Sequence, residues 1–473
     1  MILSLAGFSE QLPNTPLDQL AATVQGTKEF MAQDTVNALL VKELFASIAE
    51  QGCMLAPIRF KPLDDQALFD GDYDFVIAPS SVSEALRVTR EVLTRHGIDF
   101  AIYRRKFGKI RLAILSDDKS KQLVVEFWRE LETRNLPGAY PAVSWESLEP
   151  YIESDPDSLT GYRIAPDIEA AYYLCHLLEK NKQVDQGMVP IRLRLYRELG
   201  ALSDEIATLV ASIKTNADIA VAAFSARDYL ARKNIILRKK GVLAALYTIG
   251  NRLPYTLFKL RLSMAGSHRF IDFIGPDGVG KTSLIEAAAG KTFPSGKYFR
   301  FKKTYRKSIS YSIAHPILKR IYQARHQEKL AKNQIDDMSS GLLFYISIVG
   351  IFWRNLVCLL IGRLYLSDRS PADLLVTGYR FNDKNIAMRP SAIRDIRFMP
   401  TSRAVVHLHA PVETITARKQ EMNEQQINQY QASIFNVYLI KAPPTYICIN
   451  TDCSIEQSML ALNKLINKNS VGQ

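Results

Sequence analysis

Residues 275–282 carry a glycine-rich pattern whose chemistry is phosphate binding. They read G-P-D-G-V-G-K-T and fit the spacing G-x-x-x-x-G-K-[ST]. In such a loop the backbone amides face phosphate oxygens, the lysine reaches the β- and γ-phosphates, and the hydroxyl completes the coordination of a magnesium ion. We therefore predict a site for a nucleoside triphosphate and magnesium at Gly275, Asp277, Gly278, Val279, Gly280, Lys281, Thr282 and Ser283.

The segments on either side of this pattern are those that a phosphate-binding loop requires. Residues 270–274, F-I-D-F-I, are short and apolar and predict a buried strand, and residues 283–289 predict a helix. The alternative is a chance match in an ordinary glycine turn. The strand before the loop and the helix after it favour the phosphate site.

A second group with phosphate chemistry follows the apolar run Leu364–Ser367. This run predicts a strand that ends in Asp368, Arg369 and Ser370. A carboxylate at the end of a strand beside a phosphate loop can hold magnesium, directly or through water, and the arginine can neutralise charge on a transferring phosphoryl group. Alone, an Asp-Arg pair is as often a surface salt bridge.

Two further cations are expected near the nucleotide. Residues 403–409 predict a strand, after which a helix delivers Arg418 and Lys419. These two cations could close over the phosphates as a lid, or they could simply be favourable charges at a helix C-terminus. Residues 445–450 predict the last core strand, and Thr451-Asp452 begins a loop that could border the adenine.

Through these motifs, the C-terminal region of about 200 residues resembles the thymidylate kinase-like group of P-loop kinases. G-P-D-G-V-G-K-T at 275–282, D-R-S at 368–370 and P-V-E with Arg418-Lys419 at 411–419 carry the resemblance. It implies a parallel five-stranded core, ATP and magnesium as cofactors, and phosphoryl transfer to an acceptor beside Asp368 and Arg369. On this basis Lys281, Asp368, Arg369 and Arg418 are the expected catalytic residues, with Thr282 and Asp368 on the metal.

The chain departs from the thymidylate kinases at two places. Those enzymes usually have an Arg-Glu-Pro turn after the second strand and an Asp-Arg-Tyr or Asp-Arg-His triplet, whereas this chain has a basic run at 300–307 and Ser370. The pattern looks more like relatives that accompany bacterial surface-polysaccharide synthesis, which implies a sugar or a lipid-linked glycan as acceptor. Asp277 and Asp373 could each touch an acceptor hydroxyl, although turn formation and helix capping explain them nearly as well.

The N-terminal part has carboxylates of its own. Asp72 and Asp74 alternate along a predicted strand and so project from one face, and Glu126 could join them from a neighbouring strand as a two-metal centre. This region resembles the nucleotidyltransferase superfamily over about 100 residues, with residues 170–176 as the helical appendage, but lacks that family's Gly-Ser motif. Two alternatives stay open: a degenerate domain that recognises the acceptor, or a strand after a turn with a solvated Glu126.

The chain of 473 residues is long enough for two or three domains. We expect an α+β nucleotidyltransferase-like domain at 1–165, a helical basic region at 166–265 and an α/β P-loop kinase domain with a parallel sheet at 266–473. In the first domain the patterns predict helices at 36–48 and 82–93 and strands at 75–77, 111–115 and 123–127.

The charge and hydropathy of the chain limit the classes of partner that it can bind. The net charge is +12, and residues 227–269 contain ten Lys or Arg and one acid, Asp228. Such a stretch could contact an anionic membrane or nucleic acid, or it could be a solvated helix face that packs against the other two domains. Residues 341–366 are largely apolar, but Arg354 and Arg363 favour a buried helix and strand over a membrane span.

The cysteines and the N-terminus indicate a cytoplasmic protein, which could lie peripherally at the inner membrane. The five cysteines include no C-x-x-C pair and no zinc-type spacing, and the first residues lack the basic n-region of a signal peptide. Three functions remain: an ATP- and magnesium-dependent kinase of a sugar or glycan hydroxyl, a kinase of nucleosides, nucleotides or polynucleotides, and a nucleotide sensor with the first domain as effector.

Overall fold

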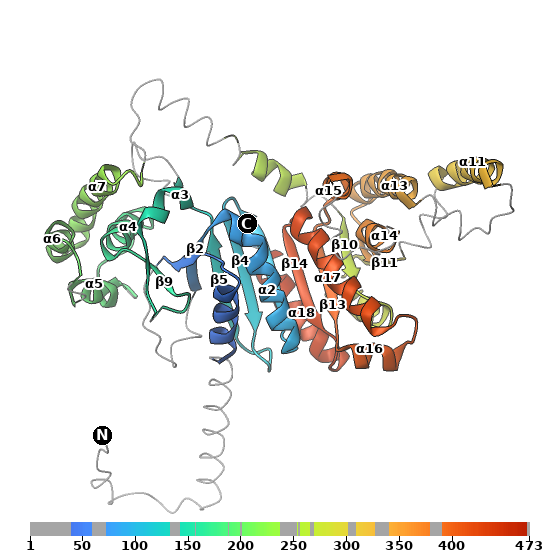
Figure 1. Ribbon diagram of the computed structural model, residues 1–473, viewed down its shortest axis with the longest axis horizontal. Coiled ribbons are helices and arrows are strands. Elements are labelled where there is room, and N and C mark those ends of the chain that lie inside the picture. Colours follow the sequence, from blue (N-terminus) through green and yellow to red (C-terminus); the bar gives the residue numbers. More distant parts are fainter. Residues whose placement is uncertain are drawn as a thin grey trace, which may run out of the picture.

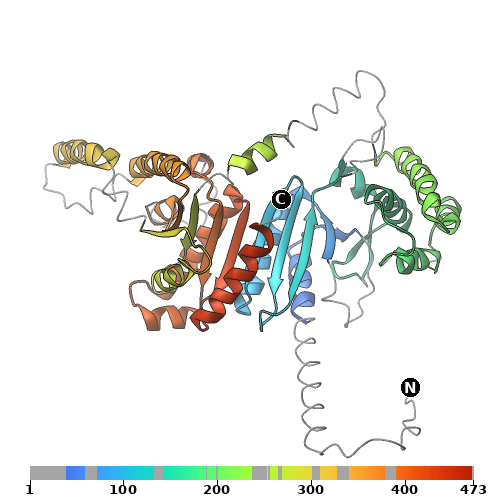
Figure 2. The same ribbon diagram turned by 180° about the vertical axis from the view of Figure 1, so that it is seen from behind.

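The computed structural model describes residues 39–58, 72–132, 142–156, 158–187, 189–198, 201–236, 253, 256–264, 269–300, 309–326, 340–378 and 390–470. A ten-stranded mixed sheet runs through the middle of the molecule, in the order β1-β2-β5-β4-β3-β14-β13-β10-β12-β11. Helices cover both of its faces: α2 and α17 lie on one face and α18 on the other (Figures 1 and 2). The chain is therefore an α/β protein of several regions built on one sheet.

The strands of the large sheet are β1 (Leu55–Pro57), β2 (Asp72–Ile77), β3 (Phe100–Lys106), β4 (Lys109–Leu115), β5 (Gln122–Trp128), β10 (Phe270–Ile274), β11 (Gly296–Arg300), β12 (Leu364–Asp368), β13 (Ala404–His409) and β14 (Thr445–Asn450). Two small antiparallel pairs flank it, β6 (Glu130–Glu132) with β7 (Ala142–Ser144) and β8 (Ile152–Ser154) with β9 (Tyr162–Ile164).

The α-helices are α2 (Val82–Arg95), α3 (Trp145–Leu148), α4 (Pro166–Glu179), α5 (Val189–Glu198), α6 (Asp204–Ser212), α7 (Asn216–Arg232), α9 (Lys281–Ala288), α11 (Ile309–His326), α13 (Ser340–Leu360), α14 (Pro371–Gly378), α15 (Pro390–Phe398), α16 (Val412–Arg418), α17 (Glu424–Lys441) and α18 (Ile455–Ser470). Residues 39–50 and 256–264 are also helical, and short 3₁₀ turns cover Pro79–Ser81 and Glu149–Tyr151.

The C-terminal half of the sheet is parallel throughout, from β11 through β12, β10 and β13 to β14. Every residue of β10 and of β13 is buried, as expected for parallel strands covered on both faces, whose sequences read as continuous apolar runs. Phe273 pairs with Asp368, so the carboxyl ends of β10 and β12 lie side by side. The predicted strands at 270–274, 364–367, 403–409 and 445–450 are confirmed to within a residue at each end.

The N-terminal half of the sheet is mixed. β2 runs parallel to β5, and β4 and β3 follow in antiparallel order. The predicted strands at 75–77, 111–115 and 123–127 fall within β2, β4 and β5, and the predicted helix at 82–93 is α2. Of the helix predicted at 36–48, the part within the described residues is confirmed.

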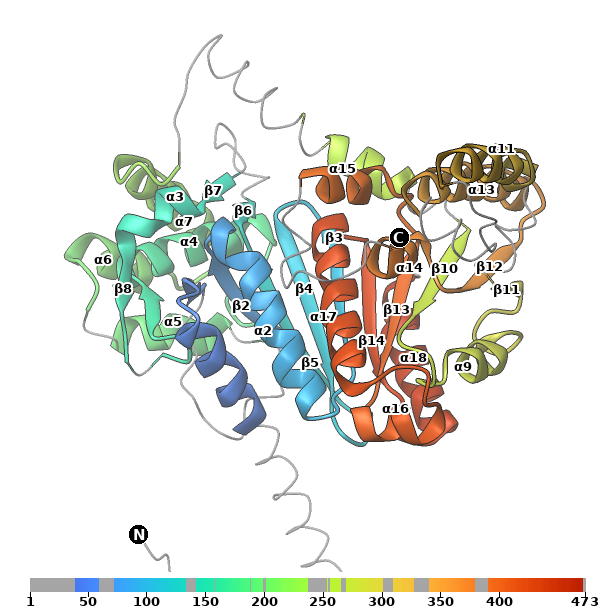
Figure 3. The same ribbon diagram turned by 45° about the vertical axis from the view of Figure 1, so that its right-hand side comes forward.

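The two halves meet in one antiparallel pair, β3 with β14, where Phe100 faces Cys448. Beside it Asp99 accepts a hydrogen bond from the Asn450 backbone at 2.6 Å and forms an ion pair with Lys119 at 2.5 Å. On one face, α2 and α17 run side by side over the junction (Figure 3). The domain division expected from the sequence implies two separate sheets, but their pairing removes two exposed strand edges, which a sheet would otherwise have to protect.

The helices α4 to α7 form a bundle beside the N-terminal half, and their apolar core is continuous with buried residues of β1, β2 and α3. It begins at Pro166, where the helical zone is expected, and α4 contains the predicted helical residues 170–176. Inside it the Tyr196 hydroxyl donates to Glu169 at 2.7 Å. Of the basic stretch 227–269, residues 237–252, 254–255 and 265–268 lie outside the described residues, as do residues 301–307 of the other basic run.

The apolar segment 341–366 forms the predicted helix and strand, α13 and β12, but α13 is not buried. Phe352, Trp353 and Leu360 are 63, 59 and 79% exposed, whereas Ile351 and Cys358 face the protein. Over 348–360, the part of α13 whose side chains are described, the prediction of a buried helix is wrong because only one stripe packs, although apolar residues surround the helix. Among the described residues, the structure contains no helix with both the length and the apolar character needed to cross a membrane.

Candidate phosphate-binding site

The loop between β10 and α9 needs its glycines for two physical reasons. Gly275, Gly278 and Gly280 have φ angles of +147°, +91° and +97°, which side chains other than hydrogen rarely allow. In addition, a Cβ on Gly275 would lie 2.7 Å from the Leu408 carbonyl oxygen, and one on Gly278 would lie 3.0 Å from that of Ile415. The backbone thus turns tightly against β13 and α16 before entering α9.

Lys281 is the first residue of α9 and folds back under the loop. Its Nζ donates to the carbonyl oxygens of Gly275 at 2.8 Å and Pro276 at 2.7 Å, and it lies 3.6 Å from Asp277. Burial lowers the pKa of this ammonium, while the Asp277 carboxylate raises it. The lysine is held by the loop itself, beneath the helix N-terminus whose dipole favours an anion.

Asp277 and Arg369 join the loop to the end of β12. Arg369 Nη2 donates to both carboxylate oxygens of Asp277, at 2.6 and 2.5 Å. Burial raises the pKa of Asp277, but the charges of Arg369 and Lys281 bring it below its ordinary value. Arg369 has a φ of +79°, an unusual backbone conformation for a residue with a side chain. Such local strain is concentrated at functional sites.

Asp368 has one carboxylate oxygen in use and one left over. The Tyr298 hydroxyl donates to Oδ2 at 2.9 Å and is also hydrogen-bonded to Thr282, so the three side chains adjoin. Oδ1 is buried and has no hydrogen-bond partner, which is costly unless a ligand or an ion meets it. A hydroxyl and an unsatisfied carboxylate oxygen are the ligands that magnesium prefers, so Thr282 and Asp368 fit this metal.

Arg418 and Lys419 reach the site from the end of α16. Arg418 Nη2 donates to the Thr451 carbonyl oxygen at 2.9 Å, and the Thr451 hydroxyl donates to the Val279 carbonyl oxygen at 2.7 Å. Lys419 pairs with Glu421 at 2.9 Å, and its Cβ would lie 3.0 Å from a Cβ on Gly278. Both cations therefore lie beside the phosphate loop, Arg418 fixed to backbone and Lys419 in an exposed pair.

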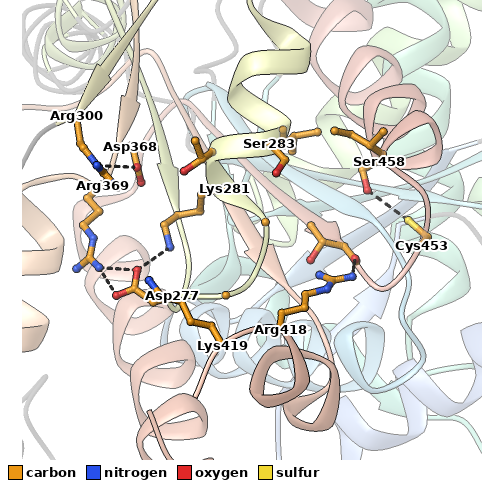
Figure 4. A pocket seen from close by; sticks show the side chains of 16 residues that line it. Asp277, Lys281, Ser283, Arg300, Asp368, Arg369, Arg418, Lys419, Cys453 and Ser458 are labelled. Atoms are coloured by element: carbon orange, nitrogen blue, oxygen red, sulfur yellow. Dashed lines mark hydrogen bonds and ion pairs between the residues drawn. The ribbon is translucent and has the colours of Figure 1, made fainter. Parts of the chain in front are cut away.

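These groups surround a cavity of about 1070 Å³ (Figure 4). It brings together the four expected catalytic residues Lys281, Asp368, Arg369 and Arg418, and its wall continues along Thr451, Cys453, Ile455 and Ser458. Of the expected nucleotide-binding residues, Asp277, Gly278, Gly280, Lys281, Thr282, Ser283 and Lys419 line it, while Gly275 and Val279 belong to the loop behind. Thr451 thus lies at the cavity, where the sequence analysis expects the adenine border.

Tyr298 has a role at this site that the sequence pattern does not specify, its bonds to Asp368 and Thr282. It lies on β11, whose register with β12 pairs Tyr298 with Leu366 and Arg300 with Asp368. The parallel pairing brings β11 residues to the end of β12, and only the strand order could have revealed this. Arg300, at the start of the predicted basic run, lines the cavity with its Nε 3.9 Å from Asp368 Oδ2.

Asp373 and Ser370 stabilise a helix start. Asp373 Oδ2 accepts from the Ser370 backbone at 2.7 Å, and its other oxygen accepts from the Tyr430 hydroxyl. Ser370 is completely buried, and its hydroxyl is 2.9 Å from that of Tyr438. Helix capping, rather than contact with an acceptor, therefore accounts for Asp373.

The carboxylates of the N-terminal half lie in a different environment. Asp74 and Glu126 are register partners on β2 and β5, and Glu126 is only 4% exposed, so the alternative of a solvated Glu126 is wrong. Lys109 forms an ion pair with Glu126, and Trp128 Nε1 donates to Asp74 at 3.1 Å. Burial and a hydrogen bond with Asp74 raise the pKa of Glu126 to about 7, against the opposing effect of Lys109.

The third predicted metal ligand, Asp72, starts β2, but the position of its side chain lies outside the described structure. Within the described part of the chain, no three His, Cys, Asp or Glu side chains form a group that could hold a metal ion. The metal role of Asp72, Asp74 and Glu126 stays a prediction. Lys109 and Trp128, which engage the two placed carboxylates, are partners that the strand pattern alone does not single out.

Comparison with known proteins gives little. No family model and no curated protein matches the chain. Among solved structures, the chain is similar to the deoxyadenosine kinase of M. mycoides with bound dATP, at 13% identity, over 41% of this chain and 98% of that one. The TM-score is 0.24, a likeness too low to support a conclusion about fold or function.

Proposed function

We propose that the protein is an ATP- and magnesium-dependent kinase that transfers the γ-phosphoryl group to a hydroxyl acceptor. The observation that carries this proposal is the meeting of two phosphate-handling groups in one cavity. Lys281 and the glycine loop come from the end of β10, and Asp368 with Arg369 from the end of β12. Ligands of open α/β sheets bind at the carboxyl ends of the strands, which is where both groups lie.

Each residue has a role in this proposal that follows from its chemistry. Lys281 exchanges its loop carbonyls for the β- and γ-phosphate oxygens, and Arg369, aligned by Asp277, faces the transferring phosphoryl group. Arg418 adds a third positive charge from α16. A magnesium ion held by Thr282 and Asp368 would neutralise charge on the phosphates. Because the transition state of phosphoryl transfer is loose, positioning and charge suffice and no strong base is required.

For the acceptor we propose a hydroxyl of a sugar or glycan. Ser370 occupies the position where thymidylate kinases carry Tyr or His, and it is fully buried in the capping of α14. It therefore offers no aromatic surface to a nucleobase, in keeping with the departure noted from the sequence. Arg300 at the mouth of the cavity suits an acceptor that is itself anionic.

For the N-terminal half we propose recognition of the acceptor rather than nucleotidyl transfer. This rests on Lys109, whose ammonium already engages Glu126, and on Trp128, which engages Asp74. A pair of carboxylates satisfied within the protein has less capacity left for two metal ions. The proposed regions are 1–165 for this unit, 166–265 for the helical one and 266–473 for the kinase.

The test is transfer of label from γ-labelled ATP, with magnesium, to fractionated bacterial lipids, glycans, nucleotides and nucleic acid. The wild type is compared with Lys281→Ala and with Lys297→Ala, which removes an exposed lysine of β11 outside the cavity. We expect label in the glycan or lipid fraction, retained in Lys297→Ala and lost in Lys281→Ala.

Other outcomes separate the alternatives. Label in the nucleotide or nucleic acid fraction would support the kinase activity but contradict a sugar or glycan as the acceptor. ATP binding without label in any fraction would overturn the kinase in favour of a sensor. Label from α-labelled nucleotides that survives Lys281→Ala but not Asp74→Ala would assign nucleotidyl transfer to the N-terminal half.

A further inference from the structure

A second cavity lies where the N-terminal half of the sheet, the helical segment 256–264 and the C-terminal half meet. Its volume is about 510 Å³, within the size range of small-molecule sites. Its walls come from the start of α2, the β3–β4 hairpin, segment 256–264, and the stretch from the end of α17 to β14. It shares no lining residue with the first cavity.

The charge of this junction cavity has one sign. Its described lining contains five basic side chains and no Asp or Glu; the basic residues are Arg104, Lys106, Lys109, Arg129 and Arg261. Lys109 is neutralised by Glu126. Within the described part of the chain, neither Arg104 nor Arg129 forms an ion pair with a carboxylate, and Arg261 donates to a neutral group, the Lys441 carbonyl oxygen, at 2.6 Å.

Arg104 lies close enough to Arg129 and Arg261 for their charges to repel its own. Burial, and after it the charges of Arg129 and Arg261, lower the pKa of Arg104 to about 10. Lys441, behind the wall, has a pKa lowered to about 8 by burial and by Arg261. Grouped cations without counter-charge destabilise a fold unless an anion binds among them.

The rest of the wall is apolar. Leu257 and Leu262 of the helical segment and Leu439 of α17 line it, and the rings of Phe107 and Phe258 pack edge to face at 5.8 Å across the hairpin and the segment. An arginine group beside an apolar wall suits a molecule with a phosphate at one end and a less polar body. Guanidinium groups match phosphate oxygens with paired hydrogen bonds, which lysines cannot provide.

We propose that the junction cavity binds a phosphate-bearing small molecule through Arg104, Arg129 and Arg261. Its walls belong to three parts of the chain, so the bound anion fixes segment 256–264 against both halves of the sheet. This site is separate from the proposed kinase site and does not depend on it. A soluble organic phosphate and the headgroup of a membrane lipid share the required chemistry.

Calorimetry with pyrophosphate tests the site in the Lys281→Ala protein, in which the phosphate loop has lost its lysine. We expect binding that weakens at least about tenfold, or about 1.4 kcal/mol, in Lys281→Ala/Arg129→Gln and further when Arg104→Gln is added, since each change removes a charge-assisted hydrogen bond to the anion. Arg194→Gln, on α5 and outside both cavities, is the matched control and should change nothing.

A second arm identifies the source of the phosphate. Flotation with phosphatidylcholine vesicles, with and without phosphatidic acid, measures whether a lipid headgroup is taken; dependence on Arg129 in either arm supports the site. Arg129 is exposed, so its variant should unfold at the wild-type temperature, which circular dichroism checks. Absence of binding in both arms, or binding unchanged by both arginine variants, overturns the proposal.

Hydrogen exchange supplies an independent readout of the bridging role. Pyrophosphate should slow exchange in the amides of 256–264 in the Lys281→Ala protein, and this protection should disappear with Arg129→Gln. Unchanged exchange in a protein that binds pyrophosphate would overturn the claim that the anion fixes this segment.

Discussion

The two halves of the sheet treat their carboxylates in opposite ways. In the C-terminal half, Asp368 keeps one buried oxygen without a partner at the wall of a large cavity. In the N-terminal half, Glu126 is paired with Lys109 and hydrogen-bonded to Asp74, whose other partner is Trp128. A carboxylate with unused hydrogen-bonding capacity is available to a ligand, and one that is satisfied internally mainly holds its strands together.

The backbone shows the same contrast. The C-terminal half holds strained conformations where the loop and Arg369 meet, including three glycines at positive φ and Arg369 at +79°. By contrast, β2 and β5 pair in continuous parallel register through Asp74 and Glu126. The N-terminal half also contains a left-handed residue with a side chain, Lys119 at φ +59°, but it lies in the turn between β4 and β5, whereas Arg369 lines the large cavity. The strain at Arg369 therefore indicates that the C-terminal half is organised around a reaction.

The largest effect should come from exchanging one carboxylate in each half. Asp368→Asn removes the charge that the metal requires, and we expect phosphoryl transfer to fall about 10²- to 10³-fold, with a higher magnesium requirement. Glu126→Gln should leave transfer within about twofold. The measurement is the rate of transfer as a function of magnesium concentration; equal losses in both variants would remove the distinction between the halves.

The next effect concerns the geometry of a cation. Arg369→Lys keeps the charge but loses the planar guanidinium whose Nη2 bonds both oxygens of Asp277, so we expect about a tenfold to hundredfold loss of kcat. Arg111→Lys, on β4 at 3.8 Å from Glu126, is the matched change in the N-terminal half and should be nearly silent. A silent Arg369→Lys would mean that charge alone, without orientation, is what the site needs.

The sequence predicts the C-terminal site well because its signals are local. The spacing of 275–282 fixes the loop, and the strands on either side are short apolar runs, so neighbouring residues determine both. The role of Tyr298 is not specified because it comes from the pairing of β11 with β12, which are separated by more than sixty residues along the chain. The joining of the two halves through β3 and β14 is likewise non-local, and no periodicity in either strand indicates its partner.

Exposure is harder to predict than secondary structure. The run 341–360 forms a helix as expected, but hydropathy alone does not tell which apolar stripe of α13 finds a partner. The same holds for Glu126, whose burial depends on the cross-strand partner Lys109 and on the layers around β5. The pattern of alternation places a residue on a face of the sheet, and the packing of that face decides its environment.

The raised pKa of Glu126 predicts how the free energy of unfolding depends on pH. The pKa of Glu126 is raised to about 7, so the folded state holds its proton more tightly than the unfolded chain does. The associated stability is full below the unfolded pKa of about 4.5 and is lost as the pH rises through 7, about 3 kcal/mol in all. Denaturant unfolding from pH 4.5 to 8 should therefore show a steeper fall in the wild type than in Glu126→Gln.

Asp272 provides the control in the other half. Burial raises its pKa to about 7 as well, while the hydroxyl of Ser402 donates to it and lowers the pKa. Asp272→Asn should flatten the same pH window by a separate amount, and the two effects should add, because the residues share no partner. If Glu126→Gln leaves the pH dependence of stability unchanged, Glu126 does not hold a proton near neutral pH in the folded protein. Glu126 and Asp74 would then again be candidates for metal binding.

The smallest effect tests whether the contrasting halves unfold as one unit. Gly97, next to the junction, has a φ of +67°, and a Cβ there would lie 2.8 Å from Asn450 Nδ2, which donates to the Gly97 carbonyl oxygen at 3.1 Å. Gly97→Ala should lower the free energy of unfolding by about 1–2 kcal/mol. Gly52→Ala, at φ +68° with open space around it, carries the conformational penalty without the contact.

If β3 and β14 couple the halves, Gly97→Ala shifts a single transition, and probes in either half report the same midpoint. In a Trp353→Phe background the remaining tryptophans, Trp128 and Trp145, both lie in the N-terminal half, so fluorescence follows that half. Protection of the phosphate-loop cavity by ATP follows the C-terminal half. Two separated transitions would mean that the shared sheet is a contact between independent folds. The Asp74–Glu126 pair and the phosphate-binding cavity would then belong to two units that can be expressed and assayed separately.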